Sequence, residues 1–502
     1  MTKQETPNLP PFDEFATRRL KRQALLDKGI NPYVHSYEKK QDIGKILGSA
    51  TGLEPEKLSQ LKVSTAGRII AKRGHGKASF GNICDESGKI QIYFKQDVLG
   101  DEKYALSQNL DVGDIVGVSG ELFITHTGEL TIKIQDFVLL SKALNPLPEK
   151  YHGLHDKELR YRKRYLDLIA NPDVKDIFSK RSKIMAFIRK FLTDLNFIEV
   201  ETPVLHTLAG GASAKPFITY HNALDMNLYL RIALELHLKR LIVGGFEKVF
   251  EIGRVFRNEG ISFKHNPEYT LLELYQAYAD YNDMMSLMEN LLSALAKEIT
   301  GEYKIKYGDN ELDFTPPFPR FTMQDIVKKH SGIDIIKTDF KGLTKLIKEK
   351  HIEIPDNYTS KGQLINLLYD KLVEPKLIQP TFVIDYPAET SPLAKRHRKD
   401  DSLVERFELI VNSLEIANAF SELNDPIDQR QRFEDQLKQR EAGDEEAHMM
   451  DNDFVESLEY GMPPTGGLGI GIDRVVMLLT NSPSIRDVIF FPHLKHKPLP
   501  NE

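Results

Sequence analysis

KVFEIGRVFRNEGISFKHNPEYTLLELYQA, residues 248–277, contains two alternating runs of apolar and polar side chains joined by a polar loop. In the first run Phe250 falls on an even position, whereas Glu251, Arg257 and Glu259 all fall on odd positions. Successive side chains of a β-strand point to opposite faces, so the even positions can pack on a core while the odd ones project from it. The stretch therefore predicts a strand whose charged residues share one face.

The second run repeats this arrangement. Leu272 and Leu274 lie on one predicted face, and Tyr269, Glu273 and Tyr275 lie on the other. A surface hairpin would instead spread its charges over solvent, and the pattern alone leaves that alternative open. The shared face favours a hairpin that lines a cleft, as in an active site.

Length and composition limit the class of protein. A chain of 502 residues is too long for one compact core, so we expect two or three domains. The polar, proline-containing start from Met1 to Pro11 does not resemble a secretory signal, and no apolar run approaches the roughly 18 residues of a membrane span. We therefore expect a soluble, cytoplasmic protein that does not bind membranes.

Cysteine content and net charge exclude further classes of protein. Cys84 is the only cysteine, which rules out an internal disulfide and a cysteine-cluster zinc site. A net charge of −6 argues against indiscriminate binding of nucleic acid, although a local basic patch can still make a specific contact. Such a patch occurs in residues 12–28, a predicted helix with several arginines, for which a solvated helix face is the other interpretation.

Five short alternating runs separated by glycines follow between about 61 and 141. Their number and length predict a small closed barrel of the oligonucleotide-binding type. Basic residues without any acid lie between Val63 and Cys84, and Phe80 and Tyr93 supply aromatic platforms. Basic groups beside aromatic rings are the ingredients for holding single-stranded nucleic acid, and a solvated surface is the alternative.

The predicted domains are a helical extension (1–60), the barrel (61–142), a proline-containing linker (143–155) and a second domain (156–502). In the second domain we expect a helix near 178–195 and an insertion of mixed helix at about 282–378. Strands are expected at 381–386 and near 404–422, with a basic loop at 395–399 between them. The whole chain is predicted to be α+β.

Two further clusters in the second domain suggest chemistry. The glycine-rich run 466–471 lacks both common phosphate-loop spacings, so it either lets a ligand approach the backbone or packs a strand tightly against a helix. Glu408 and Glu415 could hold a magnesium ion through oxygen ligands, or they could be solvated surface acids. Glu415 has the opposite parity to Asn418 and Phe420, so a bulge is required if all of them line one pocket.

Three motifs, in order, resemble those of the class II aminoacyl-tRNA synthetases. They are Phe197-x-x-Val200-x-Thr202-Pro203-x-Leu205, Phe256-Arg257-x-Glu259 and Gly469-x-Gly471-x-Asp473-Arg474. The barrel places the chain with the subgroup that charges lysine, aspartate or asparagine, and the stretches 231–281 and 415–425 look most like lysyl-tRNA synthetases. The resemblance covers nearly the whole chain and implies an N-terminal oligonucleotide-binding barrel followed by a catalytic domain built on an antiparallel sheet flanked by helices.

This resemblance implies a role for individual residues. The lysine substrate is expected to contact Gly211, Glu235, Arg257, Glu273, Tyr275, Asn418, Phe420 and Glu422. ATP is expected to contact Arg257, Glu259, His265, Tyr269 and Arg474, with Arg257, Glu259 and Arg474 also catalytic. Mg²⁺ is assigned to Glu408 and Glu415, and the tRNA anticodon to Arg68, Arg73, Phe80 and Gln91. Leu234 and Tyr269 depart from the family, which commonly has proline and phenylalanine there, but neither change removes a charge or an aromatic face.

The charge of the expected pocket favours lysine. A diamine requires carboxylates such as Glu235, Glu273 and Glu422 with few free cations, because an uncompensated buried charge costs several kcal/mol, in order of magnitude. An aspartate pocket would need added arginine or lysine. The resemblance thus implies a homodimeric lysine–tRNA ligase with lysine, ATP and tRNA(Lys) as partners. An asparagine or aspartate enzyme and a non-catalytic RNA-binding paralogue are the alternatives.

Overall fold

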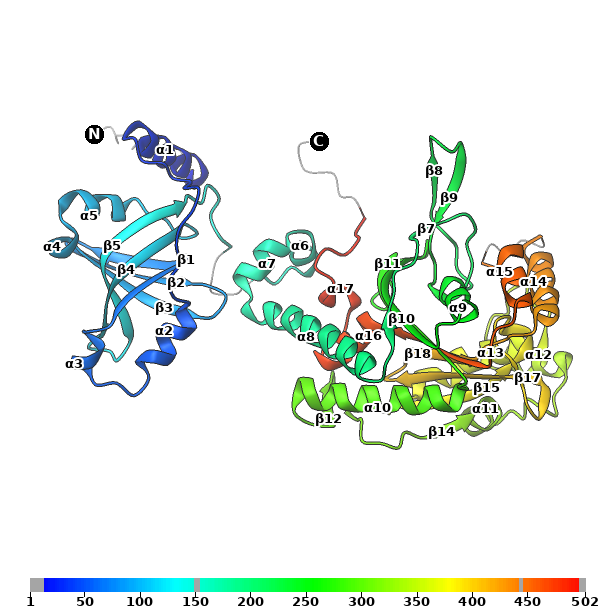
Figure 1. Cartoon of the computed structure of the whole chain (residues 1–502). Coiled ribbons are helices and arrows are strands. Elements are labelled where there is room, and N and C mark those ends of the chain that lie inside the picture. The colour runs from blue at the N-terminus through cyan, green and yellow to red at the C-terminus, as the bar shows by residue number, and fades with distance from the viewer. Residues whose placement is uncertain (1–12, 149–153, 442–445, 496–502) are drawn as a thin grey trace, which may run out of the picture. The chain divides into compact units, whose positions relative to one another are not determined.

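The computed structural model describes residues 13–148, 154–441 and 446–495, and the chain divides into two compact units, Met1–Leu154 and His155–Glu502 (Figure 1). The amino-terminal segment 1–11 and residues 149–153 of the predicted linker lie outside the described residues. Among the described helices, none is both long enough and apolar enough to cross a membrane.

The first unit contains a closed five-stranded barrel with the strand order β1-β2-β3-β5-β4. Its strands are β1 (Lys62–His75), β2 (Ala78–Cys84), β3 (Lys89–Lys95), β4 (Ile115–Ile124) and β5 (Leu130–Ser141). Alternate residues such as Ile83, Ile92 and Ile132 are fully buried inside the barrel. The alternation of the five runs therefore closes around one apolar core, and the predicted barrel is confirmed.

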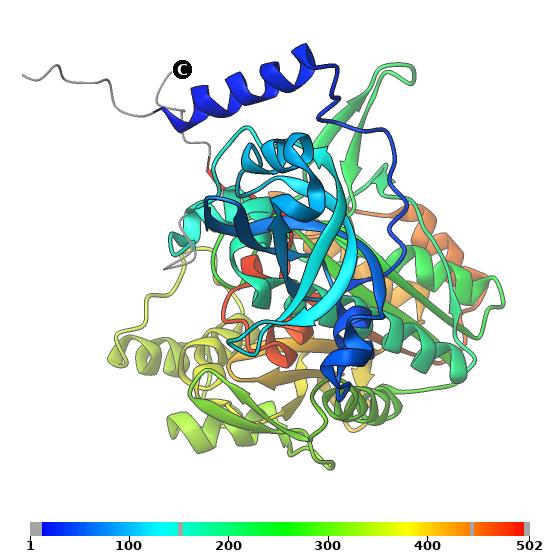
Figure 2. The same cartoon turned by 90° about the vertical axis from the view of Figure 1, so that its left-hand side faces the viewer.

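Helices surround this barrel. They are α1 (Glu14–Asp27), α2 (Ile43–Ala50), α3 (Pro55–Leu58), α4 (Gln96–Leu99) and α5 (Asp101–Gln108). Helix α1, dark blue in Figure 2, begins where the Asp13 side chain accepts the Ala16 N–H. Arg18 of α1, expected on a solvated or polyanion-binding face, is buried, and its Nη1 donates to the carbonyl oxygens of Val112 and Ala143. This cation therefore ties α1 to the barrel.

The second unit is built on a nine-stranded sheet with the order β14-β15-β17-β18-β19-β11-β10-β6, with β16 paired to β17. The strands are β6 (Ile198–Glu199), β10 (Lys248–Phe256), β11 (Glu268–Ala277), β14 (Arg320–Thr322), β15 (Thr381–Pro387), β16 (Arg396–His397), β17 (Asp400–Val411), β18 (Leu414–Ser421) and β19 (Thr465–Gly471). Only the two end pairs, β6 with β10 and β14 with β15, are parallel. The predicted antiparallel sheet flanked by helices is thus confirmed.

One face of the sheet is covered by three helices, of which α10 runs along the bottom of the unit in Figure 1. These are α8 (Pro172–Asp194), α10 (Tyr281–Thr300) and α16 (Ile472–Leu479). Phe250, Leu272 and Leu274, the predicted core positions of the hairpin, are fully buried against them. Helix α10 starts at the edge of the predicted 282–378 insertion, yet its apolar face belongs to this central core.

The opposite face carries α9 (Glu235–Val243), α14 (Pro426–Glu441) and α15 (Asn452–Glu459), whose apolar residues form a separate core cluster. A small sheet of β7 (Leu205–His206), β8 (Ile218–His221) and β9 (Met226–Leu230) extends from this side, and the β8–β9 hairpin projects from the unit in both views (Figures 1 and 2).

The remaining elements of the unit lie at its edges. They are α6 (Lys157–Arg162), α7 (Arg164–Ala170), β12 (Lys304–Tyr307), β13 (Asn310–Asp313), α11 (Met323–Ser331), α12 (Phe340–Glu349), α13 (Lys361–Leu372), η1 (Glu374–Lys376), η2 (Ala388–Thr390) and α17 (Ile485–Val488). Helices α11 to α13 pack around Leu343, Ile347 and Leu364, which form a core cluster of their own beside β15.

Candidate active site

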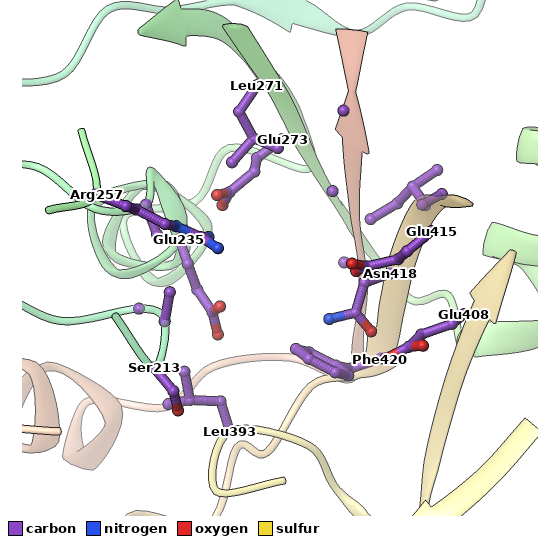
Figure 3. A pocket seen from close by; sticks show the side chains of 18 of the residues that line it. Ser213, Glu235, Arg257, Leu271, Glu273, Leu393, Glu408, Glu415, Asn418 and Phe420 are labelled. Carbon is purple, nitrogen blue, oxygen red and sulfur yellow. The ribbon is translucent and has the colours of Figure 1, made fainter. Parts of the chain in front are cut away.

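A cavity of about 660 Å³ lies over β11, β18 and β19, between these strands and the start of α9 (Figure 3). We refer to it as the main cavity. Its lining includes every residue that the sequence assigned to lysine, ATP or Mg²⁺, and these come from segments as distant as residues 211 and 474. On the second strand of the hairpin the odd positions Glu273 and Tyr275 face it, because the even positions Leu272 and Leu274 are committed to the core.

Arg257 follows directly after β10 and points into the main cavity (Figure 3). Its Nε donates to the carbonyl oxygen of Ile232 at 3.3 Å, and its guanidinium carbon lies 5.4 Å from the centre of the Tyr269 ring. Among the described residues no carboxylate lies within ion-pair distance of it. A cation held this way is available to a bound anion.

The loop after Arg257 brings Glu259 and His265 to the same wall of the cavity. The Nδ1 of His265 is 2.9 Å from the hydroxyl oxygen of Ser262, which fixes the plane of the ring. Burial lowers the pKa of His265, and Arg474 lowers it further. The imidazole is therefore neutral near pH 7 and offers a hydrogen bond rather than a charge.

Three buried carboxylates gather at the closed end of the cavity. Glu273 accepts the Leu234 N–H at 3.0 Å on one oxygen and the Tyr275 hydroxyl at 3.1 Å on the other. Burial raises its pKa to about 7, and the nearby Glu235 adds to this effect. Burial likewise raises the pKa of Glu422 to about 8. A cation placed beside such carboxyl groups favours their ionised form and so offsets the effect of burial on their pKa.

A buried lysine that the sequence did not single out lies behind these carboxylates. Lys239 of α9 is fully buried, and its Nζ contacts Glu235 at 2.5 Å and Glu422. Because Lys239 is paired with both carboxylates, it is not a free cation of the kind that the expected pocket lacks. The helical spacing of Glu235 and Lys239, four residues apart, was the signal that could have suggested the contact.

Arg406 of β17 is a second functional cation that the sequence interpretation missed. Its Nε donates to Oδ1 of Asn418 at 3.1 Å, and its Nη2 donates to Glu408 at 2.6 Å. The guanidinium carbon also lies 5.7 Å from the centre of the Phe420 ring. Because Oδ1 is occupied, Asn418 turns its N–H₂ group toward the cavity, where it can donate to a carboxylate.

Glu408 and Glu415 lie on neighbouring strands on the side of the cavity that Figure 3 shows beside Asn418. Strands β17 and β18 change register here. Leu409 pairs with Ala417, but the next residue, Ile410, pairs with Glu415, so one residue of β18 is left over. The predicted bulge is thereby confirmed, and it brings Glu415 to the same wall as Asn418. Burial raises the pKa of Glu408 to about 7, Arg406 opposes this, and Glu415 adds to it.

Arg474, in the first turn of α16, closes this wall. Its Nη1 donates to the carbonyl oxygen of Glu415 at 2.6 Å and lies 3.3 Å from the Glu415 carboxylate. The glycine-rich run before it forms β19, and it packs tightly against the neighbouring strands. A Cβ on Gly467 would overlap Glu422 Oε1 and the Tyr275 ring, so glycine is required for these side chains to reach the cavity.

One expectation about charged residues is corrected by the structure, and the contacts of a second charged segment are now visible. Glu251 shares the parity of Arg257 but does not line the main cavity, because its carboxylate binds Arg231 at 2.6 Å and the Thr202 N–H at 3.0 Å. The basic loop at 395–399 is partly strand β16, and Arg398 is bound to Glu405 and Asp280. That arginine is therefore a structural cation.

In the barrel, Arg73 and Phe80 are direct partners across β1 and β2, and the Phe80 ring stacks on Tyr93 at a centroid distance of 4.5 Å. Arg68 donates to the Gly113 carbonyl at 2.8 Å. Gln91 is buried, and its amide binds Glu129 at 2.6 Å and Thr131 at 2.8 Å. An aromatic and cationic surface is thus present, with Arg68 and Gln91 already partnered within the barrel.

Sequence comparison places these two sites within a known family. The family model for tRNA synthetases class II (D, K and N) matches residues 156–495, and the model for the OB-fold nucleic acid binding domain matches residues 63–140. The chain belongs to the class II tRNA synthetases of this group. The synthetase domain contains the main cavity, and the nucleic-acid-binding domain is the barrel.

Relatives of this synthetase are similar along nearly its whole length. A protein named lysine–tRNA ligase from Thermoanaerobacter pseudethanolicus is 56% identical over 483 residues, which cover 96% of this chain and 95% of the relative. Another of the same name, from Bacillus cytotoxicus, is 54% identical over 488 residues, covering 97% of this chain and 98% of the relative.

Proposed function

We propose that the chain is a lysine–tRNA ligase. It activates L-lysine with ATP to give lysyl-adenylate and pyrophosphate, and then transfers lysine to the 3′ end of tRNA(Lys). The observation that carries lysine specificity is the cluster of three buried carboxylates, Glu235, Glu273 and Glu422, at the closed end of the main cavity. Two ammonium groups satisfy such a cluster, whereas the carboxylate of aspartate would be repelled by it.

Lysine lies along the cavity with its two ends recognised by different groups. Glu235 and the backbone at Gly211 bind the α-ammonium, and Glu273, Tyr275 and Glu422 bind the ε-ammonium. Phe420 packs on the alkyl chain. Arg257 and Asn418 bind the carboxylate, a role supported by the unpaired Arg257 guanidinium and by the Asn418 amide that Arg406 orients.

ATP occupies the wall formed by Glu259, His265, Tyr269 and Arg474. The adenine lies between the Tyr269 ring and the Arg474 guanidinium, and Glu259 and His265 position the nucleotide. The lysine carboxylate attacks the α-phosphorus in line, and Arg257 neutralises the charge that develops there. No protein general base is needed, because the attacking carboxylate is already ionised.

Magnesium fits Glu408 and Glu415. The two carboxylates face the cavity from adjacent strands, and burial together with Glu415 holds the pKa of Glu408 near 7 against the opposing effect of Arg406. Oxygen ligands of this kind suit Mg²⁺, with phosphate oxygens and water completing the shell. When bound, the ion neutralises charge on the phosphates and the leaving pyrophosphate.

The barrel binds the tRNA anticodon through Arg68, Arg73, Phe80 and Gln91. Stacking on Phe80 and contacts from the exposed Arg73 suit an unpaired loop. A non-catalytic RNA-binding paralogue is disfavoured, because Arg257, Glu259, Glu408, Glu415 and Arg474 are all present and all line one cavity.

The ligase works as a homodimer in the cytoplasm, where tRNA is charged for translation. The dimer contact is the region around Pro203. It is supported by the exposed apolar residues Ile198, Val204 and Leu205 beside it, since exposed apolar clusters mark interfaces. The domains proposed from the sequence are the extension (1–60), barrel (61–142), linker (143–155) and catalytic domain (156–502).

Pyrophosphate exchange into ATP, measured with each amino acid in turn, tests this function. Lysine should support exchange, and asparagine and aspartate should not. Arg257→Ala should abolish lysine-dependent exchange, whereas Arg254→Ala, an exposed arginine three residues earlier on β10, should not change it. Exchange with asparagine or aspartate but not lysine would overturn the substrate, and full activity of Arg257→Ala would overturn the catalytic assignment.

A further inference from the structure

Lys239 connects two carboxylates that come from different parts of the second unit. It lies on α9 one turn after Glu235, whereas Glu422 follows the end of β18. Its Nζ is 2.5 Å from Glu235 Oε1 and also contacts Glu422 Oε2. The Lys239 side chain has no exposed area, and Nζ lies 6.0 Å from the centre of the Phe454 ring on α15. Lys239 itself does not line the main cavity, so it lies behind the two carboxylates that it binds.

Both partners of Lys239 also face the main cavity. Glu235 points into it in Figure 3. The Oε1 of Glu422 is buried and has no hydrogen-bond partner among the described residues, and it lies where Gly467 leaves room next to Tyr275. Glu422 therefore gives one oxygen to Lys239 and keeps the other for a donor that enters the cavity.

The fixed charges around Lys239 can be counted. Glu235, Glu273 and Glu422 carry three negative charges when ionised, and Lys239 carries one positive charge. His448, which lines the same cavity, is neutral near pH 7, because burial lowers its pKa to about 4 and Lys239 lowers it further. With all three carboxyl groups ionised, as the proposed binding of lysine requires, the balance is minus two, equal and opposite to the two ammonium groups of lysine.

We propose that Lys239 is a positioning residue that determines specificity, because its buried ammonium fixes both the charge and the separation of the two carboxylates that receive the α- and ε-ammonium groups of the substrate. The proposal rests on the lysine-binding roles of Glu235 and Glu422 given above. Lys239 does not touch the substrate. It acts by holding Glu235 and Glu422 against one common cation, which limits how far apart the two carboxylates can lie.

A merely structural ion pair is the competing explanation, and the chain contains a matched example. Lys142 in the first unit is also fully buried between two carboxylates, with Nζ 2.5 Å from Asp111 and 2.8 Å from Asp114. It lies in the unit that does not contain the main cavity. Lys142→Met therefore removes an equivalent ion pair without touching the lysine site.

The experiment compares Lys239→Met, Lys239→Arg and Lys142→Met in the full-length chain by lysine-dependent pyrophosphate exchange. Lys239→Met should raise KM for lysine by about tenfold or more, because two buried carboxylates lose their shared partner. KM for ATP should stay within about twofold, since the nucleotide is bound elsewhere in the cavity. Lys142→Met should leave both constants unchanged while lowering the melting temperature.

A pH profile separates positioning from stability. Lys239 lowers the pKa of Glu422 against the effect of burial, so without its ammonium that pKa should rise, and KM for lysine should level off at a pH about one unit higher in Lys239→Met. Lys239→Arg keeps the charge and should keep the original profile. Its longer, planar group should nevertheless change the spacing of the carboxylates and reduce the preference for lysine over ornithine.

A wild-type KM and pH profile in folded Lys239→Met would overturn the proposal. If that variant does not fold, Lys239→Arg decides, and an unchanged ratio of lysine to ornithine activation would then overturn it. Failure of the proposed function is recognised separately, because the unmodified chain would then show no lysine-dependent exchange, or Glu422→Gln would have no effect on KM for lysine.

Discussion

Arg406 donates its Nε hydrogen to Oδ1 of Asn418 across 3.1 Å, and this bond determines which end of the amide faces the main cavity. The same arginine binds Ser391 at 3.0 Å and Glu408 at 2.6 Å. It therefore links the part of the cavity assigned to the amino acid with the part assigned to the metal.

Asn418→Asp tests the orientation of this amide. The change replaces the N–H₂ group proposed to bind the lysine carboxylate with a negatively charged oxygen. The kcat/KM for lysine in pyrophosphate exchange should therefore fall by about 100-fold, which corresponds to about 2.7 kcal/mol. Asn357→Asp, the same change at an exposed position, should have no effect. An unchanged kcat/KM in Asn418→Asp would show that this amide does not contact the substrate.

Binding of lysine should depend on pH through Glu273 and Glu422, whose pKa values burial raises to about 7 and about 8. The pKa of such a carboxyl group is higher in the folded chain than in the unfolded chain. Its contribution to stability is complete below the pKa of the unfolded chain, and it is lost as pH rises through the pKa of the folded chain. Bound lysine needs the ionised forms and offsets the loss.

The increase in melting temperature caused by saturating lysine should consequently grow between pH 6 and pH 8. It can be followed by differential scanning fluorimetry in buffers of constant ionic strength. Glu422→Gln removes one of the two titrating groups and should flatten the dependence. A lysine-induced shift that is the same at both pH values would contradict the assignment of these carboxylates to the ammonium groups.

Glu251→Gln should destabilise the second unit without a direct effect on chemistry. Glu251 is buried with Arg231, and breaking such a pair leaves an uncompensated buried charge that costs about 3 kcal/mol. Thermal denaturation measures this loss. Glu199→Gln, at a half-exposed pair with Arg189 nearby, should cost less than about 1 kcal/mol. Equal stability of the two variants would refute the structural role of Glu251.

Phe80→Ala should weaken charging of tRNA and leave amino acid activation unaffected. Loss of one stacking partner costs about 1 to 3 kcal/mol, so KM for tRNA should rise by about 5- to 150-fold in an aminoacylation assay. Pyrophosphate exchange in the absence of tRNA provides the internal reference. Phe15→Ala, an exposed aromatic on α1, is the matched control and should behave as the unmodified chain does.

Glu415→Gln should raise the magnesium concentration that gives half-maximal exchange, because one of two proposed carboxylate ligands becomes neutral. Titration of Mg²⁺ at fixed ATP measures the change. KM for lysine at saturating magnesium should remain close to the original value, since Glu415 does not lie at the closed end of the cavity. An identical magnesium requirement would exclude Glu415 as a ligand.

Much of this arrangement could be predicted from local sequence pattern. The parity of residues 248–277 assigned Phe250, Leu272 and Leu274 to the core, and all three are fully buried there. The parity conflict at Glu415 predicted a bulge that the register confirms. Both inferences succeeded because alternation along a strand depends only on neighbouring residues.

The failures involve contacts between distant segments. Glu251 has the parity of a cavity residue, but Arg231, twenty positions earlier, binds it. Lys239 lies in the amphipathic stretch ELHLKRLIV, where a lysine ordinarily marks a solvated face. Its burial depends on Glu422, which is far away in the chain. Periodicity assigns a side chain to a face, and it does not reveal which opposite charge the fold brings there.

Gly467 limits how this protein can change. Any other residue at this position would place its Cβ on Glu422 Oε1 and the Tyr275 ring, so the strand tolerates no side chain. In the proposed binding mode, an inhibitor with an ammonium group seated between Glu422 and Tyr275 would contact the same groups as the ε-ammonium of lysine. A substitution at Gly467 that excluded the inhibitor would then also weaken the binding of lysine.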